Sequence, residues 1–370
     1  MDRLLEDIKE LTSLDGPPSR EDRVIEYMVA RLRPLDRDLS IDPLGNITCR
    51  IGSGRTGAKR LMIFAHMDEI ALIVRKIEPN GFLRFERVGG VHVNVLPGLR
   101  VNVLGNQGIV SGLIGIKSHH YTKPEEKGVV PAFQDLYVDI GVSSREEALR
   151  AGVGVGAMIV YRSDFIQLPG GLVANKAMDN RAACALLIAL AEALHAKRRQ
   201  LQWDVYLVAC VQEEFNIRGI LPTARRIRPD ASIGVDVTPA CDTPDLAGYS
   251  DVAVGKGPAL TMINFHGRGT LAGVLPDQRL LEKLKETAAR AAIPIQPEVA
   301  MGVITENAYI SLLGDGIPTA GVSLPCRYTH TPIETISLAD LRLMKTWLLE
   351  FALSLRAEER FGKGPGPGGG

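Results

Sequence analysis

The 370-residue sequence lacks the features that mark several classes of protein. Its 43 lysines and arginines are matched by 43 aspartates and glutamates, so it has no basic surplus of the kind that binds nucleic acids. Its five cysteines form no CxxC pair, which argues against a disulfide framework or a cysteine zinc site. No apolar run approaches the roughly 18 residues of a membrane span, and the charged N-terminal segment lacks the apolar core of a secretory signal. These absences predict a cytoplasmic protein that binds neither nucleic acid nor membrane.

The spacing of apolar residues divides the chain into two kinds of region. Helical and strand patterns alternate over residues 1–69 and 168–356, which is typical of a sheet covered by helices. Over residues 70–167, short apolar runs are separated by Gly-Gly and Asn-Gly turns, which is typical of a small β domain. Residues 357–370 end in a Gly/Pro-rich tail that we predict to be disordered. The predicted fold is α/β: a mixed central sheet with helices on both faces, built from both chain ends, with a β-rich domain inserted.

Capping patterns mark where some of the helices begin. Ser19 and Asp22 open the apolar repeat of SREDRVIEYMVARL, and Ser337 and Asp340 open that of the last helix. Both pairs predict a side-chain hydrogen bond at the helix N-terminus. A further short helix is predicted at SREEALRAG, within the β-rich region.

Acidic and histidine side chains gather where predicted strands end. In an open α/β sheet, ligand sites form beyond the carboxyl ends of the strands, so side chains there meet at one edge. Taken singly, each has an ordinary explanation, such as a helix cap or a solvated strand end. Their common placement in one chain favours a shared site. The residues so placed are His66, Asp68, Glu213, Glu214, Asp236 and His330, with Asp179 just before a long helix.

The side-chain types in this set indicate a catalytic metal site. Its two imidazoles, with three of its five carboxylates, suit zinc, cobalt or manganese better than magnesium or calcium, which prefer oxygen ligands. Two divalent ions about 3.5–4 Å apart need a carboxylate and a water between them. Five ligands with one shared carboxylate leave each ion an open position, which is the catalytic arrangement. The sequence therefore predicts two divalent metal ions per subunit.

The adjacent pair Glu213 and Glu214 predicts two different roles. Neighbouring side chains in an extended segment point in different directions. One of them can bind a metal ion while the other faces an attacking water as general base. Amide hydrolysis at a metal site requires such a base.

Several motifs resemble those of one known family. In chain order, from about residue 42 to residue 340, they are DPLGNI, AHMDEI, GFLRFERVGG, DLYVDIGVSSREEA, KAMDNR, VQEE followed by RG, GVDVT, GKGPAL, IPIQ and RYTHTPIETISLAD. The chain resembles the di-metal tetrahedral aminopeptidases, which are grouped with the glutamyl aminopeptidases and often labelled cellulase M or endoglucanase. The resemblance implies a zinc-exopeptidase fold of the phosphorylase/hydrolase-like kind, with an inserted PDZ-like dimerisation domain. It also implies peptide substrates and dimers that build a tetrahedral dodecamer.

The same resemblance implies a role for each residue of the site. One ion would be held by His66 and Asp236 and the other by Glu214 and His330, with Asp179 as the bridging carboxylate. Glu213 would be the general base and acid. Asp68 would fix the ring of His66 and raise its basicity. Zinc or cobalt is the expected metal, with manganese as an alternative.

The sequence departs from the family pattern near the site. Phe215 and Asn216 follow the glutamate pair, where the family usually has a small aliphatic residue and glycine. Glu306 stands where the family commonly has aspartate. Glu306 and His120, which lies in the inserted region, are candidate substrate-binding residues.

Other functions remain alternatives to removal of N-terminal residues from peptides. A di-metal deacylase would use the same ligands and act on N-acylated substrates. The endoglucanase label would instead indicate a glycoside hydrolase. Such an enzyme normally uses two carboxylates that flank the scissile bond, without a metal. A degenerate assembly protein would have lost part of the site, yet all five predicted ligands and the base are present.

Overall fold

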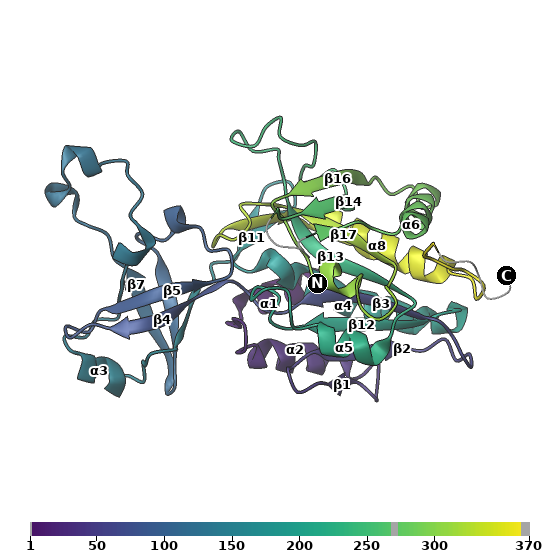
Figure 1. The fold of residues 1–370 in the computed structure, drawn as a ribbon, viewed down its shortest axis with the longest axis horizontal. Helices are drawn as coiled ribbons and strands as arrows, with labels where there is room; N and C mark the ends of the chain where they lie inside the picture. Colours follow the sequence, from purple (N-terminus) through teal and green to yellow (C-terminus); the bar gives the residue numbers. More distant parts are fainter. Residues whose placement is uncertain (1, 268–272, 364–370) are drawn as a thin grey trace.

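The structure is a computed structural model, and it describes residues 2–267 and 273–363 (Figure 1). Two bodies lie side by side along its longest axis. The smaller one is a barrel, and the larger one is a sheet with helices that contains the first and last described segments of the chain. Of the predicted disordered tail, residues 364–370 lie outside the described residues.

The larger body is built on a mixed sheet of twelve strands. The strands are β1 (Ser40–Ile41), β2 (Ile47–Ile51), β3 (Arg60–His66), β10 (Ile166–Leu168), β11 (Leu172–Asn175), β12 (Asp204–Cys210), β13 (Ala231–Pro239), β14 (Ala259–Phe265), β15 (Gly273–Val274), β16 (Gln296–Met301), β17 (Thr319–Arg327) and β18 (Glu334–Ser337). Their order is β1-β2-β12-β3-β13-β17-β18-β11-β10, and β14 pairs with β15, β16 and β17. The central strands β12, β3, β13 and β17 are parallel neighbours, so their carboxyl ends lie at one edge.

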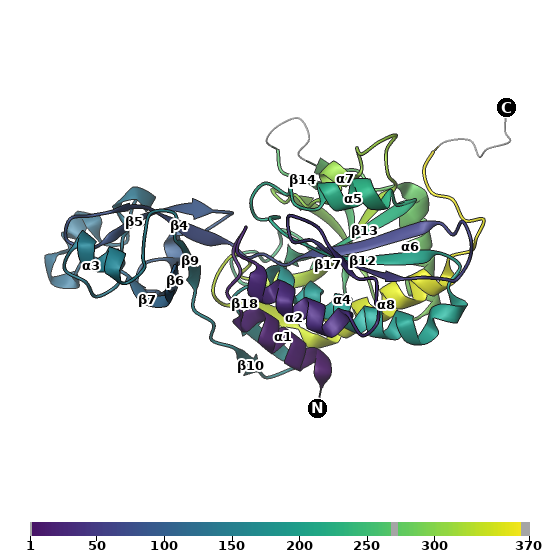
Figure 2. The ribbon, with the colours of Figure 1, turned by 90° about the horizontal axis from the view of Figure 1, so that it is seen from below.

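Helices cover both faces of this sheet (Figure 2). They are α1 (Arg3–Ser13), α2 (Asp22–Leu32), α4 (Met178–Lys197), α5 (Leu221–Ile227), α6 (Gln278–Arg290), α7 (Asn307–Ile310) and α8 (Leu338–Ser354), with the short turn η5 (Arg198–Gln200) after α4. The apolar side chains of β3 alternate between the faces: Leu61 and Ile63 pack into the core beneath α1, α4 and α8, whereas Met62 and Phe64 pack against α5 and α7. The predicted mixed α/β architecture is confirmed.

None of the helices in the described part of the chain is long and apolar enough to cross a lipid bilayer.

The predicted cap of the last helix is confirmed in part. The hydroxyl of Ser337 accepts a hydrogen bond from the backbone N–H of Asp340 over 3.2 Å. The carboxylate of Asp340 does not return a bond to the cap. It accepts the N–H groups of Gly255 and Gly257 at 2.6 and 2.9 Å, and so ties a loop of the larger body to α8.

The predicted cap at Ser19 is wrong. Helix α2 begins at Asp22, and no side chain caps it. Ser19 has a φ of 69°, in the left-handed region, whereas an N-cap residue adopts an extended backbone. Instead, the carboxylate of Glu21 accepts the N–H groups of Ser19 and Gln212.

The smaller body is a closed barrel of six strands, which agrees with the predicted β-rich insertion. The strands are β4 (Ala71–Ile77), β5 (Leu83–Val88), β6 (Arg100–Gly105), β7 (Gly108–Ile114), β8 (Val138–Asp139) and β9 (Met158–Tyr161), with the turn η1 (Val93–Val95) after β5. The predicted short helix is α3 (Arg145–Arg150), capped by the hydroxyl of Ser144. The domain boundaries at residues 70 and 167, the PDZ-like character of the barrel and its role in dimerisation stay predictions.

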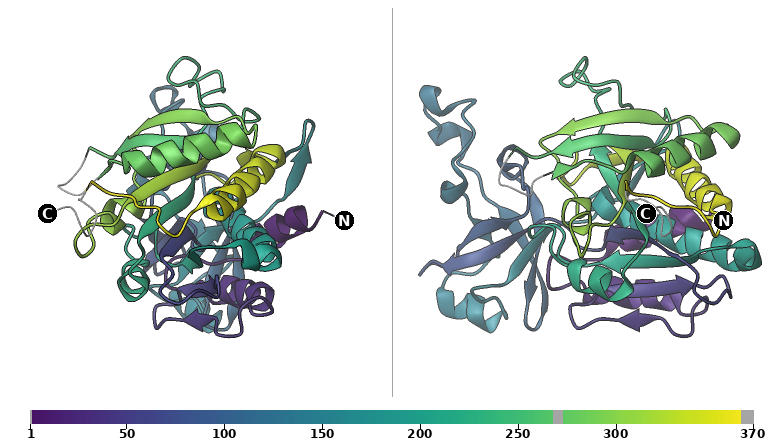
Figure 3. Two further views of the ribbon diagram at one scale, coloured as in Figure 1. Left: turned by 90° about the vertical axis from the view of Figure 1, so that its right-hand side faces the viewer. Right: turned by 45° about the vertical axis from the view of Figure 1, so that its right-hand side comes forward.

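Residues 115–135, between β7 and β8, form an arm that extends away from the barrel (Figure 3). The arm contains the short turns η2 (His119–Tyr121), η3 (Pro124–Glu126) and η4 (Phe133–Asp135). It exposes the apolar side chains of Tyr121 and Val129 and also the candidate residue His120.

Candidate metal centre

The ends of the central strands bring the predicted residues together. β3 ends at His66, and Glu213 and Glu214 follow the end of its parallel neighbour β12. Asp236 lies near the end of β13, and His330 follows β17. The parallel arrangement therefore delivers side chains from four separate strands to one edge of the sheet.

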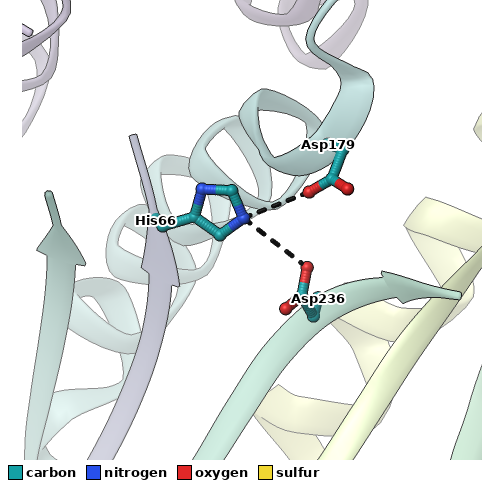
Figure 4. A group of neighbouring side chains, drawn as sticks. All are labelled: His66, Asp179 and Asp236. Carbon is teal, nitrogen blue, oxygen red and sulfur yellow. Dashed lines mark hydrogen bonds and ion pairs between the residues drawn. The ribbon is translucent and has the colours of Figure 1, made fainter. Parts of the chain in front are cut away.

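Asp179, in the first turn of α4, lies next to His66. Its Oδ1 atom is 3.1 Å from His66 Nε2, and Asp236 Oδ1 is 3.8 Å from the same nitrogen (Figure 4). The potential ligand atoms of these three residues lie within 4.8 Å of one another, so the group could hold a metal ion.

A second group shares Asp179 with the first. The other carboxylate oxygen, Oδ2, is 3.3 Å from His330 Nε2, and Glu214 Oε1 is 3.6 Å from that nitrogen. Ligand atoms of Asp179, Glu214 and His330 also meet within 4.8 Å. The two oxygens of one carboxylate thus face two different histidines.

Both histidines present the Nε2 atom to this cluster because Nδ1 is engaged elsewhere. Nδ1 of His330 is 3.0 Å from the carbonyl oxygen of Gly90, and Nδ1 of His66 is 3.2 Å from the carbonyl oxygen of Asp68. A proton on Nδ1 that is donated to a carbonyl fixes the ring and leaves Nε2 with a free lone pair. That is the tautomer a metal ligand needs.

Asp68 is fully buried, and its carboxylate binds chiefly to the backbone of the glutamate pair. Its two carboxylate oxygens accept the backbone N–H groups of Glu213 and Glu214 at 3.0 and 2.9 Å. Its carboxylate lies farther from His66, at 3.6 Å from Nδ1. The sequence predicted that Asp68 fixes the His66 ring, and the structure assigns the nearer contact to its backbone carbonyl.

Glu334 is a residue of the site that the sequence analysis missed. One of its carboxylate oxygens accepts the N–H of Asp179 at 3.0 Å, and the other accepts the N–H of His330 at 2.6 Å. The side chain is buried. A single carboxylate therefore joins the two loops that carry these two residues.

The glycine pair at the end of β5 was also missed as part of the site. A Cβ atom on Gly90 would lie 2.5 Å from His330 Nδ1, and one on Gly89 would lie 3.1 Å from Glu214 Oε2. Such contacts are too close for a side chain, so glycine lets the barrel approach the second group. The glycine pair can be seen in the sequence as the motif VGG, but its role follows only from its closeness to residues 214 and 330.

The carboxylates of the site are buried or half-buried and lie close together. Burial raises the pKa of Glu214 to about 8, and burial with the nearby charge of Asp179 raises that of Asp236 to about 7. Burial acts to raise the pKa of Asp179 as well, but hydrogen bonds from His330 and His66 hold it below its usual range. Divalent cations relieve repulsion among ionised carboxylates. This donor set therefore fits a metal.

The cluster opens into a cavity of about 1020 Å³. Six of the seven residues placed at the strand ends and before α4 line it; the exception is the buried Asp68. Further walls come from residues 87–90 of the barrel, residues 215–217 after the glutamate pair, and residues 302–304 after β16. The arrangement can therefore hold a substrate against the cluster.

The two candidate substrate-binding residues do not line this cavity. Glu306 is buried behind the cluster, where Cys210 Sγ lies 3.0 Å from its carboxylate. His120 lies on the exposed arm. A role for His120 at the site of another copy of the chain stays a prediction.

Comparison with known proteins shows that this fold and site are those of an aminopeptidase. The chain belongs to the M42 family of glutamyl aminopeptidases, whose family model matches residues 45–346. The resemblance inferred from the sequence motifs is thereby confirmed.

Relatives and solved structures agree with this membership. The chain is 48% identical to the putative aminopeptidase SgcX of Escherichia coli over 87% of its own length and 86% of that protein. It is 30% identical to the lysyl aminopeptidase of Pyrococcus furiosus over 86% of each chain. Aminopeptidase APDkam598 of Desulfurococcus kamchatkensis superposes with a TM-score of 0.89 at 33% identity, covering 96% of each chain. The TET1 peptidase of Pyrococcus horikoshii, described as assembling into a tetrahedron or a large octahedral shell, gives a TM-score of 0.84 at 30% identity, covering 95% of this chain and all of that one.

Proposed function

We propose that the protein is a metal-dependent aminopeptidase that uses two divalent ions to remove N-terminal residues from peptides. The observation that carries the proposal is the position of Asp179. One of its carboxylate oxygens is 3.1 Å from His66 Nε2, and the other is 3.3 Å from His330 Nε2. A carboxylate that bridges two ions must present one oxygen to each of two ligand sets.

Each ion would then have three protein ligands. His66 and Asp236 complete one set with Asp179, and Glu214 and His330 complete the other. Three ligands leave an open position for water or substrate, as catalytic sites require. Mixed imidazole and carboxylate ligands suit zinc or cobalt, with manganese as an alternative.

Glu213 is the proposed general base and acid. When bound, the two ions would polarise the scissile carbonyl and lower the pKa of an attacking water. The carboxylate of Glu213 lines the same cavity, where it would take a proton from the attacking water as the water oxygen bonds to the carbonyl carbon. It returns the proton to the peptide nitrogen as the C–N bond breaks. Asp68 holds the backbone of Glu213 in place through the hydrogen bond described above.

We further propose that the chain self-associates in the cytoplasm, as dimers that build a tetrahedral dodecamer. The similarity to the tetrahedral TET1 peptidase supports this assembly. The barrel is the proposed dimerisation domain, and the exposed apolar side chains of Tyr121 and Val129 on its arm offer a surface for contact. Light scattering on the purified protein measures the number of subunits.

Metal removal and restoration test the activity. We expect about two ions per chain by elemental analysis, loss of activity in a chelator, and recovery when zinc, cobalt or manganese is returned. The substrates are peptides with a free amino terminus and the same peptides acetylated at the N-terminus. Cleavage of only the free peptides supports the proposal.

Two results would contradict it. Full activity in the metal-stripped protein would rule out the two-ion mechanism. A preference for the acetylated peptides would make the protein a deacylase that uses the same ligands.

A further inference from the structure

Phe215 is an aromatic side chain that stands at the edge of the cavity. It directly follows the glutamate pair, lines the cavity, and exposes 46% of its surface. The family that the sequence motifs resemble usually has a small aliphatic residue at this position. The aromatic ring is therefore a property of this chain and not of the shared metal cluster.

The backbone on both sides of Phe215 is anchored. On one side, the N–H groups of Glu213 and Glu214 are bound by Asp68. On the other side, the N–H of Ile217 donates to the carbonyl oxygen of Glu213 at 2.6 Å, which closes a tight turn. Phe215 thus lies within a turn that is attached to the catalytic residues themselves.

Two further contacts support this position. The side chain of Ile217 is buried in a small apolar cluster with Val274 and Ala308, which holds the far end of the turn. The guanidinium of Arg218 lies 6.0 Å from the centroid of the Phe215 ring, within the range of a cation–π contact. The ring is therefore held beside the site, where the residue lines the cavity and stays partly exposed.

The chemistry of the other walls fits an apolar group better than a basic one. Seven further lining residues have apolar or aromatic side chains: Val88, Ile217, Val237, Pro239, Val303, Ile304 and Tyr309. Apart from the predicted ligands and Glu213, the described lining residues include no aspartate or glutamate. A lysine or arginine side chain of a substrate would find no free carboxylate to pair with there.

We propose that Phe215 determines specificity, because its ring packs against a large apolar or aromatic side chain of the peptide. That side chain belongs to one of the two residues that flank the scissile bond. The inference rests on the proposed aminopeptidase function and adds the substrate class to it. An aromatic pair contributes enough beyond simple burial to change affinity by roughly tenfold.

The test uses two series of tripeptides, X-Ala-Ala and Ala-X-Ala, in which X is Ala, Leu, Phe, Glu or Lys. Each is measured with the metal-loaded wild type and with Phe215→Ala and Phe215→Leu. We expect the wild type to prefer Phe and Leu over Lys in one series. Phe215→Ala should lower the Phe-to-Ala ratio of kcat/KM in that series by about tenfold, mainly through KM, because contact with an unreactive side chain is uniform binding.

Phe215→Leu keeps an apolar surface and should retain part of the preference, more for Leu than for Phe. Tyr249→Ala is the matched control, since Tyr249 is an exposed aromatic residue that does not line the cavity. It should leave every ratio unchanged. The series in which the ratio falls identifies which of the two residues contacts the ring.

Three outcomes would overturn the inference. The first is an unchanged Phe-to-Ala ratio in both series for an active Phe215→Ala variant. The second is a wild-type preference for Glu that disappears in Arg87→Gln, which would assign specificity to the arginine that also lines the cavity. The third is a wild type that, with metal restored, cleaves none of the peptides. Only that third outcome also removes the proposed function, so the two failures are distinguishable.

Discussion

The sheet and the barrel contribute to the cavity in different ways. The sheet and α4 supply the six predicted site residues that line it, which come from four neighbouring strand ends and one helix start. The barrel supplies residues 87–90, whose closest approach is made by backbone and by glycines without side chains. The chemistry therefore resides in the sheet, whereas the barrel closes the wall beside it.

This difference predicts how each body responds to substitution. A ligand or base in the sheet can be removed with little change in shape, so the loss should concern metal content or proton transfer. A side chain added at Gly89 or Gly90 in the barrel wall introduces bulk and should act through the position of Glu214 or His330. The predictions below test that division, beginning with the largest expected effect.

The sheet side is tested most severely by Asp179→Asn. An amide nitrogen cannot ligate a cation, so one of the two oxygen positions is lost. We expect the loss of at least one ion per chain and a fall in kcat/KM of roughly a thousandfold or more, since a catalytic ion supplies several kcal/mol. Elemental analysis and peptide hydrolysis measure the two effects. Asp204→Asn is the control, because Asp204 is also buried but binds Arg50 and Ser53 away from the cavity.

Glu213→Gln separates chemistry from metal binding within the sheet. We expect both ions to remain while kcat falls by roughly 10²–10⁴, the contribution of a positioned general base. The neighbouring variant Glu214→Gln should instead lose an ion. If Glu213→Gln keeps near-normal turnover, or if the two variants behave alike, the division of roles within the pair is wrong.

The clustering of the candidate ligands could be predicted from the sequence because parallel strands make its geometry simple. His66, Asp236 and His330 each stand at or just after the end of an apolar run, and three such runs form neighbouring parallel strands. The departure at Asn216 is also explained by local backbone. Its φ of 65° lies in the left-handed region, which asparagine adopts more readily than most residues when glycine is replaced.

The remaining features depend on contacts that no local pattern contains. Gly90 meets His330 across 240 positions in the chain, so its purpose depends on how the barrel docks. Glu334 acts through backbone N–H groups, which are the same for every residue type except proline. The cap at Ser19 failed because the chain turns left-handed there. Tertiary arrangement decides each of these cases.

Gly90→Ala tests the barrel side. The φ angle of Gly90 lies outside the left-handed region, so alanine is acceptable to the backbone, but its Cβ would lie 2.5 Å from His330 Nδ1. We expect the His330 ring to move and the metal affinity of its group to fall by roughly 10–100-fold, as for other disturbances next to a ligand. The group around His66 should keep its ion.

Gly154→Ala is the control for that variant, because a Cβ at Gly154, in the loop before β9, would meet no atom within 4 Å. Metal titration of the stripped proteins compares the two. Unchanged affinity in Gly90→Ala would show that the barrel wall does not constrain the ligand.

The smallest effect is expected for Glu334→Gln, which changes neither a ligand nor the cavity wall. The amide keeps one acceptor oxygen and turns an N–H donor toward the second backbone N–H, so one of the two clamping hydrogen bonds is replaced by repulsion. We expect about tenfold weaker binding of the metal ions, at the low end of the range for residues that support a ligand.

Asp340→Asn is the matched control for Glu334→Gln, since Asp340 is also a buried carboxylate that accepts two backbone N–H groups, those of Gly255 and Gly257. Both variants should lower the melting temperature, but only Glu334→Gln should weaken zinc or cobalt binding and alter the absorption spectrum of the cobalt-loaded protein. Equal metal affinity in the two variants would mean that Glu334 stabilises the fold without positioning Asp179 and His330.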